Sequence, residues 1–327
     1  MNNFKLLLLT LVVVGCQNPQ TKKTMTTKKI VIAHRGASGY LPEHTLEAKA
    51  MAYAMHPDYL EQDIVLSKDD VPIVVHDITL DDVTDVAQQF ADRKREDGKY
   101  YVIDFTYKEL LQLNVSERFD TKTGKAVFKN RFPLWKSHFK LHSLQDEIEM
   151  IQGLNKSTGE NIGIYPEIKE PAFHLENGKD ISVIVLKVLS NYGYTKKDNC
   201  ILQCFDATEL KRIRQELKSN LFLVQLTEFA EDNSKLPEFA TYADGVGPYF
   251  KQLIKKFDPK TGKIAFNDYV KNAHELGMVV HAYTFRADQL EDLPSFDYLL
   301  DLAFNKANLD GVFTDFSDKA FLFINKN

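Results

Sequence analysis

The first β-α-β unit of the chain is residues 30–66, IVIAHRGASGYLPEHTLEAKAMAYAMHPDYLEQDIVL. It opens with a β-rich run at 30–34, continues through a helical stretch at 45–56, and closes with a second β run at 59–66. Thr45 is a residue type that favours a helix N-cap. This order predicts two parallel strands connected by a helix.

The second β run continues directly into a hairpin. A turn at residues 67–70 leads within a few residues into a further β run at 71–76. This gap is too short for a parallel crossover, which needs about a dozen residues or more. The run at 71–76 therefore predicts an antiparallel arm on the second strand.

The alternation of β runs and helices continues to the end of the chain. Apart from the hairpin arm, eight parallel strands are expected, at residues 30–34, 59–66, 162–168, 201–205, 221–226, 243–247, 278–285 and 310–314. Helices are expected at residues 45–56, 144–154, 181–191, 207–218, 267–276, 296–305 and 318–324. Eight β/α units predict an α/β fold, a TIM (β/α)8 barrel, over residues 30–325.

One segment does not follow this alternation. Residues 81–142 are rich in aromatic and charged side chains and are too long for a passive loop. We predict that they form an insertion subdomain, placed after the hairpin of the second strand and covering one end of the barrel.

The N-terminus has the pattern of an export signal. An apolar run at 6–14, which contains one threonine, is too short for a membrane-spanning helix but suits a signal-peptide core. The run ends in Val13-Val14-Gly15-Cys16, which resembles a bacterial lipobox. We expect residues 1–15 to be a lipoprotein signal peptide and Cys16 to carry the lipid; an ordinary secretory signal with a chance cysteine is the alternative. Residues 16–29 then form a flexible tether, and the protein is exported and lipid-anchored in the cell envelope, facing the periplasm or the cell surface.

Composition excludes several classes of protein. With 44% hydrophobic and 27% charged residues, the chain is neither disordered, collagenous nor a multi-span membrane protein. Lys and Arg number 41 against 46 Asp and Glu, so the basic footprint of a nucleic-acid binder is missing. The only expected membrane contact is the lipid anchor, and the oligomeric state stays open. Cys200 and Cys204 lie four apart in one strand, too far apart for a disulfide, and are expected to be buried free thiols.

Polar residues gather where the first three barrel strands end, and active sites of TIM barrels lie at those ends. The first strand finishes with His34-Arg35-Gly36, and the hairpin arm ends in His76-Asp77. Glu61 and Asp63, two apart on the second strand, share a face, as do Glu167 and Lys169 on the third.

These residue types are suited to phosphate-ester chemistry. Carboxylates on rigid strands are typical ligands of Ca²⁺ or Mg²⁺. Arg35 and Lys169 are suited to an anionic ligand, and two histidines near neutral pKa are suited to paired acid and base catalysis. Each feature has an ordinary alternative; Glu167 and Lys169, for example, could simply pair with each other. Convergence at three consecutive strand ends favours the functional interpretation.

The motifs also resemble those of the glycerophosphodiester phosphodiesterase family, closest to its exported, longer bacterial type. The resemblance extends over nearly all of residues 29–325. The matching segments, in chain order, are His34-Arg35-Gly36, Pro42-Glu43-His44-Thr45, Glu61-Gln62-Asp63-Ile64, Val75-His76-Asp77, Pro166-Glu167-Ile168-Lys169, Gln203-Cys204-Phe205-Asp206, Asp244-Gly245-Val246-Gly247-Pro248, His281-Ala282-Tyr283-Thr284 and Gly311-Val312-Phe313-Thr314-Asp315.

The resemblance implies a role for each matching residue. The metal, Ca²⁺ rather than Mg²⁺, would be bound by Glu61, Asp63 and Glu167, with His34 and His76 as general acid and base. Phosphate would be held by Arg35 and Lys169, and Tyr283 would line the glycerol pocket. Glu43 would orient Arg35 or its loop, and His44 replaces an asparagine common in the family. The histidines to which the resemblance assigns no role are expected to be structural or at the surface: His56, His138, His142, His174, His274 and His281.

The implied reaction is metal-dependent hydrolysis of glycerophosphodiesters, such as glycerophosphocholine or glycerophosphoethanolamine, to sn-glycerol 3-phosphate and an alcohol. The head group, the order in which the histidines act, and direct water attack against a cyclic phosphate are left open. Two alternatives remain: a phospholipase D-like lipid hydrolase on the same barrel, and a non-catalytic lipoprotein that binds phosphate esters.

Overall fold

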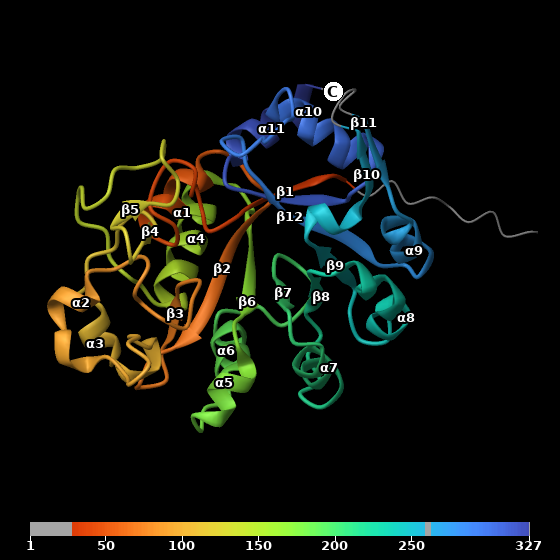
Figure 1. The fold of residues 1–327 in the computed structure, drawn as a ribbon. Coiled ribbons are helices and arrows are strands. Elements are labelled where there is room, and N and C mark those ends of the chain that lie inside the picture. Colours follow the sequence, from red (N-terminus) through yellow and green to blue (C-terminus); the bar gives the residue numbers. More distant parts are fainter. Residues whose placement is uncertain (1–27, 259–262, 327) are drawn as a thin grey trace, which may run out of the picture.

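The computed structural model describes residues 28–258 and 263–326. Within them, eight parallel strands form a closed barrel, because β1 pairs with both β2 and β13 (Figure 1). Around the barrel the order is β1-β13-β12-β9-β8-β7-β6-β2. The strands are β1 (Ile30–Ala33), β2 (Tyr59–Leu66), β6 (Gly163–Ile168), β7 (Ile201–Cys204), β8 (Phe222–Thr227), β9 (Gly245–Pro248), β12 (Val279–Phe285) and β13 (Gly311–Thr314). The predicted TIM barrel is confirmed.

The hairpin arm is also present. β3 (Pro72–Val74) pairs antiparallel with the end of β2, Ile64 lying opposite Val74. β2 has eight residues and β1 has four, so the far end of β2 extends beyond its pairing with β1 and is free to pair with β3.

Helices surround the barrel at the positions where the sequence predicts them. The Thr45 side chain accepts a hydrogen bond from the backbone N–H of Ala48, as expected of an N-cap. Helices α5 and α8, which are short, were not predicted, because six or four residues carry too little periodicity to detect. The helices of the barrel layer are α1 (Leu46–Tyr53), α4 (Leu144–Thr158), α5 (Pro171–Glu176), α6 (Ile181–Asn191), α7 (Ala207–Gln215), α8 (Leu236–Phe239), α9 (Tyr269–Glu275), α10 (Phe296–Asp301) and α11 (Ser317–Lys326).

The segment between β3 and α4, which contains the predicted insertion at residues 81–142, lies on one side of the barrel, against β2 and β3 (Figure 1). It has an apolar cluster of its own, in which Phe105, Leu110 and Phe139 pack on Val65 and Ile73 of the hairpin. This packing places the segment beside the strand ends that carry the predicted site. Its elements are α2 (Val86–Gln89), two short 3₁₀ turns (Ala91–Arg93 and Val102–Asp104), α3 (Tyr107–Leu110), β4 (Phe119–Asp120) and β5 (Lys125–Ala126).

A second small hairpin, β10 (Ile254–Asp258) with β11 (Lys263–Phe266), precedes α9. Side chains fill the barrel interior, with Tyr165 and Phe313 packed edge to face at 5.0 Å. Cys200 and Cys204 are buried and unpaired by disulfide, as predicted.

No helix in the described ranges is both long and apolar enough to cross a membrane. Residues 1–27 lie outside the described residues. They include the predicted signal peptide at residues 1–15, the predicted lipidation site Cys16 and most of the predicted tether at 16–29.

Candidate active site

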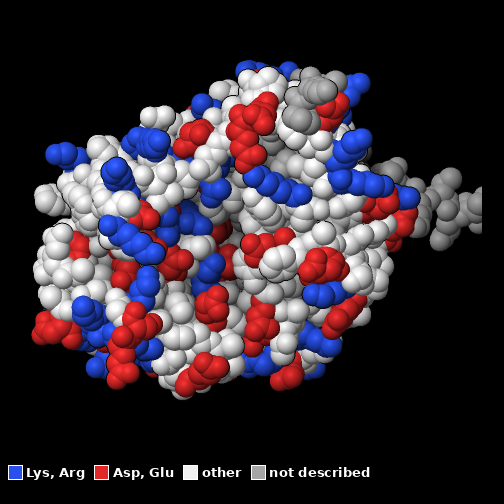
Figure 2. Space-filling view, in the orientation of Figure 1, with Lys and Arg blue, Asp and Glu red and all other residues white. Residues whose placement is uncertain are grey.

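Two cavities open at the carboxyl ends of the barrel strands. One has a volume of about 240 Å³ and contains Glu61, Asp63 and Glu167 in its wall. The other, about 230 Å³, is lined in part by Arg118, Phe128 and Arg131 of the segment between β3 and α4. Both cavities share His34, Arg35, His76 and Arg286. Figure 2 shows a hollow near the middle of this face, in which acidic and basic side chains gather. A larger cavity, of about 590 Å³, contains none of the predicted site residues.

Three buried carboxylates lie close together in the first cavity. Asp63 of β2 lies directly opposite Glu167 of β6 in the sheet, which follows from the parallel register of the two strands. The Glu61 Oε2 atom accepts the backbone N–H of Arg35 at 2.5 Å. The Lys169 Nζ atom is 2.8 Å from Glu167 Oε1 and 3.7 Å from Asp63 Oδ1.

The protonation of these carboxylates reflects their crowding. Burial and the neighbouring Asp63 raise the pKa of Glu61 well above its usual range. Burial raises the pKa of Glu167 to about 8, against the opposing charge of Lys169. Burial works in the same direction on Asp63, but the cations around it, led by Lys169, hold its pKa well below the usual range. Burial therefore favours the protonated form of Glu61 and Glu167, while the surrounding cations keep Asp63 ionised.

His44 belongs to the same group. Its Nε2 atom is 2.8 Å from Asp63 Oδ2, and ligand atoms of His44, Glu61 and Asp63 all lie within 4.8 Å of one another. Asp63 Oδ1 is buried and receives no hydrogen bond from the described residues. Carboxylate oxygens are typical ligands of a divalent cation, and Asp63 Oδ1, which accepts no hydrogen bond from the described residues, is available to bind one. No metal-binding role is predicted for His44 from the sequence, and the predicted ligand Glu167 lies beside this group rather than within it.

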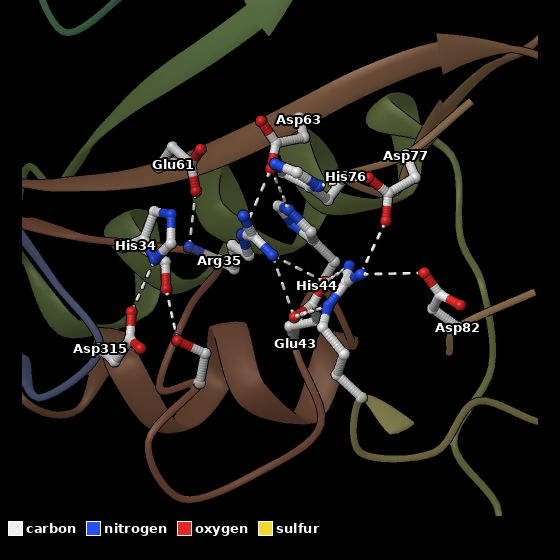
Figure 3. Close-up of polar contacts among 12 residues, drawn as sticks. His34, Arg35, Glu43, His44, Glu61, Asp63, His76, Asp77, Asp82 and Asp315 are labelled. Carbon is white, nitrogen blue, oxygen red and sulfur yellow. Dashed lines mark hydrogen bonds and ion pairs between the residues drawn. The ribbon is translucent and has the colours of Figure 1, made fainter. Parts of the chain in front are cut away.

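Two histidines face the shared part of the cavities, and each is bound to an aspartate. His34 Nδ1 is 2.6 Å from Asp315 Oδ1, and His76 Nδ1 is 2.7 Å from Asp77 Oδ1 (Figure 3). Burial and Arg35 lower the pKa of His34 to about 4, and they also lower the pKa of His76. With Nδ1 bound to a carboxylate, Nε2 of each ring is the atom left for chemistry.

Arg35 lies between the two pairs in Figure 3. Its Nη1 atom is 3.0 Å and 3.1 Å from the two oxygens of Glu43, so the predicted contact of Glu43 with Arg35 is present. The turn after Arg35 depends on Gly36, which has a φ of +84°, and an added Cβ would lie 2.9 Å from the backbone of Ala48 in α1. A side chain at position 36 would therefore displace the loop that carries His34 and Arg35.

Tyr283 lines the first cavity through its ring. Its hydroxyl donates to the carbonyl oxygen of Thr227 at 3.0 Å, and its ring lies 5.9 Å from that of Phe205 and 5.8 Å from that of Tyr249. Five of the histidines without a predicted role contact residues outside the predicted site. The contacts are His56 with Glu160, His142 with Glu147, His174 with the Leu66 N–H, His274 with Asp310 and His281 with Tyr165.

The sequence prediction missed several residues that complete the site. Asp77 and Asp315 lie in matching motif segments, but the resemblance assigns no role to them. Arg286 binds Asp315, with Nε 2.7 Å from Oδ2, and lies one residue beyond β12, where its place after a strand end was a usable signal. Arg118 and Arg131 come from the segment between β3 and α4, which offers no such signal.

The chain is similar to several known proteins along most of its length. Residues 34–319 match the model of the glycerophosphoryl diester phosphodiesterase family. A glycerophosphodiester phosphodiesterase of Haemophilus influenzae is 48% identical over 96% of this chain and 95% of its own length. One from Treponema pallidum is 37% identical, over 92% and 93% respectively.

Solved structures share the fold at low sequence identity. One from Silicibacter pomeroyi has a TM-score of 0.70 and 22% identity, over 92% of this chain and 94% of that one. An Oleispira antarctica phosphodiesterase, solved with its product sn-glycerol-3-phosphate, has a TM-score of 0.61 and 20% identity, over 90% and 96%.

Proposed function

Because the chain belongs to the glycerophosphoryl diester phosphodiesterase family and is such an enzyme by close homology, we propose that it uses a bound metal ion and two histidines to hydrolyse glycerophosphodiesters. The products are sn-glycerol 3-phosphate and an alcohol, and substrates include glycerophosphocholine and glycerophosphoethanolamine. The observation that carries the proposal is that His34, His76 and Arg35 lie where the two cavities meet, beside the buried carboxylates.

The metal would be held by the predicted ligands Glu61, Asp63 and Glu167. Ligand atoms of Glu61 and Asp63 already lie together with that of His44, whereas Glu167 contacts Lys169. Its charge would compensate the carboxylates and polarise a phosphate oxygen when substrate is present. Oxygen-rich ligands suit Ca²⁺ or Mg²⁺, and the family resemblance favours Ca²⁺.

The two histidines would divide the proton transfers. One Nε2 atom takes the proton of the nucleophile as its oxygen bonds to phosphorus, and the other gives a proton to the alcohol oxygen as its bond to phosphorus breaks. Arg35 and Lys169 hold the non-bridging phosphate oxygens, Arg35 with a planar fork and Lys169 with a point charge. The Tyr283 ring borders the glycerol.

The first experiment is release of glycerol 3-phosphate from glycerophosphocholine by residues 26–327. It is run with EDTA, and then with Ca²⁺ or Mg²⁺ restored. Loss of product on chelation and recovery with one ion supports the proposal. Hydrolysis of phosphatidylcholine vesicles without hydrolysis of glycerophosphocholine would instead identify a phospholipase D-like enzyme. Tight binding of the substrate without product release would identify a non-catalytic binding protein.

The proposal extends to location. The lipobox-like Val13-Val14-Gly15-Cys16 supports export and a lipid anchor on Cys16, so that the barrel acts in the cell envelope. Labelling of the wild-type protein by radioactive palmitate, and its loss in Cys16→Ser, is the expected result. Equal labelling of both proteins would remove Cys16 as the anchor.

A further inference from the structure

The segment between β3 and α4 sends one arginine to each His–Asp pair. Arg118 Nη1 is 2.8 Å from Asp77 Oδ2, and Arg131 Nη2 is 2.6 Å from Asp315 Oδ2. In both pairs the histidine contacts Oδ1 and the arginine contacts Oδ2. The Asp77 carboxylate is therefore held between an imidazole and a guanidinium, and the Asp315 carboxylate between an imidazole and two guanidinium groups, since Arg286 also contacts its Oδ2.

Arg131 is itself fixed from several sides. Its side chain is 3% exposed, and its guanidinium lies 3.7 Å from the centre of the Phe128 ring. Its nitrogens also bind both carboxylate oxygens of Asp288, at 2.8 Å and 3.2 Å, and the Ser38 carbonyl oxygen at 3.1 Å. A group with this many partners has one position, so it fixes the plane of the Asp315 carboxylate.

Arg118 reaches a second part of the site. Besides Asp77, its Nη2 and Nε atoms contact Glu43 at 2.6 Å and 3.2 Å. Glu43 in turn contacts Arg35, the residue placed on the phosphate. Burial would raise the pKa of Glu43, but Arg118 and Arg35 hold it well below the usual range, so this link stays ionised. One side chain of the segment thus connects His76 and Arg35.

These contacts have a catalytic consequence. The direction of each Nε2 atom depends on where its ring is held, and the ring is held through Nδ1 by an aspartate. Partners that orient a catalytic group from behind commonly change activity by about 10- to 100-fold when removed. A misplacement of about 1 Å at the reacting atoms has a similar effect.

We propose that Arg118 and Arg131 are positioning residues of the hydrolytic reaction, so that the segment between β3 and α4 completes the active site rather than only covering it. This inference rests on the proposed function, because it assumes that His34 and His76 carry the proton transfers. Neither arginine takes or gives a proton; each sets the carboxylate that orients a histidine.

The test uses Arg118→Ala and Arg131→Ala in the full chain, with Arg95→Ala as the matched control. Arg95 belongs to the same segment and pairs with Asp104 at 2.7 Å and 2.8 Å, but lines neither active-site cavity. We expect kcat to fall by about 10- to 100-fold in the two site variants, with KM little changed. Arg95→Ala keeps the wild-type kcat even where its melting temperature falls.

Ethylguanidinium, added below denaturing concentration, separates positioning from folding. Partial recovery of kcat in Arg131→Ala or Arg118→Ala, with no effect on Arg95→Ala, supports the inference. If Arg131→Ala does not fold, Arg118→Ala and Arg131→Lys take its place, since Lys keeps the charge and loses the fork; a lowered kcat is expected.

Two results would overturn the inference. One is a wild-type kcat in folded Arg118→Ala and Arg131→Ala. The other is a loss confined to KM, which would mean that the arginines bind substrate directly. Failure of the proposed function is a different result, because the wild-type protein itself would then release no glycerol 3-phosphate with any divalent ion.

Discussion

The two His–Asp pairs have nearly the same bond length and very different surroundings. His34 and Asp315 are 281 residues apart in the chain, and their side chains are 10% and 2% exposed. His76 and Asp77 are neighbours in sequence, and about a third of each side chain is exposed, 30% and 32%. The first pair is brought together by two adjacent barrel strands, β1 and β13, and the second by one turn of the chain.

The difference shows two ways of building the same His–Asp contact. A pair supplied by the barrel is rigid because both backbones are in one sheet, and its Asp315 also binds Arg131 and Arg286. A pair on a loop has less support, and Arg118 supplies much of it. We expect perturbations of the two pairs to have similar effects on chemistry and unequal effects on stability.

The largest effect is expected from Asp63, which belongs to neither His–Asp pair and is a proposed ligand of the metal. Asp63→Asn keeps the size of the side chain and removes its charge from the carboxylate group. We expect kcat/KM to fall by about 10³-fold, a loss typical for a single strong electrostatic stabiliser. Calorimetric titration with Ca²⁺, run on both proteins, should show weaker binding in the variant. Normal turnover and normal Ca²⁺ affinity would remove Asp63 from the metal site.

Removal of either imidazole tests whether the pairs are equivalent in chemistry. His34→Ala and His76→Ala should each lower kcat by about 10²-fold or more, the range of general acid–base catalysis. The measurement is glycerol 3-phosphate release at saturating substrate. Near-normal turnover in one variant would exclude that histidine from the mechanism and would show that the two His–Asp pairs are not equivalent in chemistry.

The aspartates should separate the pairs. Asp315→Asn leaves two guanidinium groups without their buried partner, so we expect a loss of about 3–5 kcal/mol in the free energy of unfolding. Asp77→Asn, at a partly exposed site, should cost about 1 kcal/mol or less. Urea denaturation measures both, and kcat should fall by about 10- to 100-fold in each folded variant. Equal losses of stability would mean that burial does not distinguish the pairs.

The last effect is on stability alone, a pH dependence that comes from the buried pair. Because the pKa of His34 is about 4 in the folded chain and about 6.5 in an unfolded one, the unfolded state binds more protons between these values. Stability should therefore fall as pH falls from about 6.5 to 4, and His34 should add nothing to the slope above about pH 7.5. Urea midpoints across this range should show a shallower slope in His34→Asn. The exposed His56→Asn is the control, and an equal change in both variants would assign the slope elsewhere.

Local sequence patterns are sufficient to predict the barrel and the residues at the centre of the candidate site. Alternation of short β runs and helices gives parallel strands, and parallel strands place all their carboxyl ends at one edge. The two-residue period of a strand then puts Glu61 and Asp63 on one face. His34, Arg35 and Lys169 were found because they follow buried strands directly, so their place needed only local information.

The surroundings of these residues depend on contacts between parts of the chain that are distant in sequence. Asp315 reaches His34 because the closed barrel sets the last strand beside the first, a contact that no local pattern contains. His44, which contacts Asp63 from a loop, itself has a φ of +55°, a backbone conformation that no sequence pattern predicts at this position. Arg118 and Arg131 lie in the segment between β3 and α4, whose helices and strands are too short to show a periodic pattern in the sequence. The position of this segment depends on apolar packing against Val65 and Ile73. Local periodicity specifies elements, and only closure and packing specify which charged groups meet.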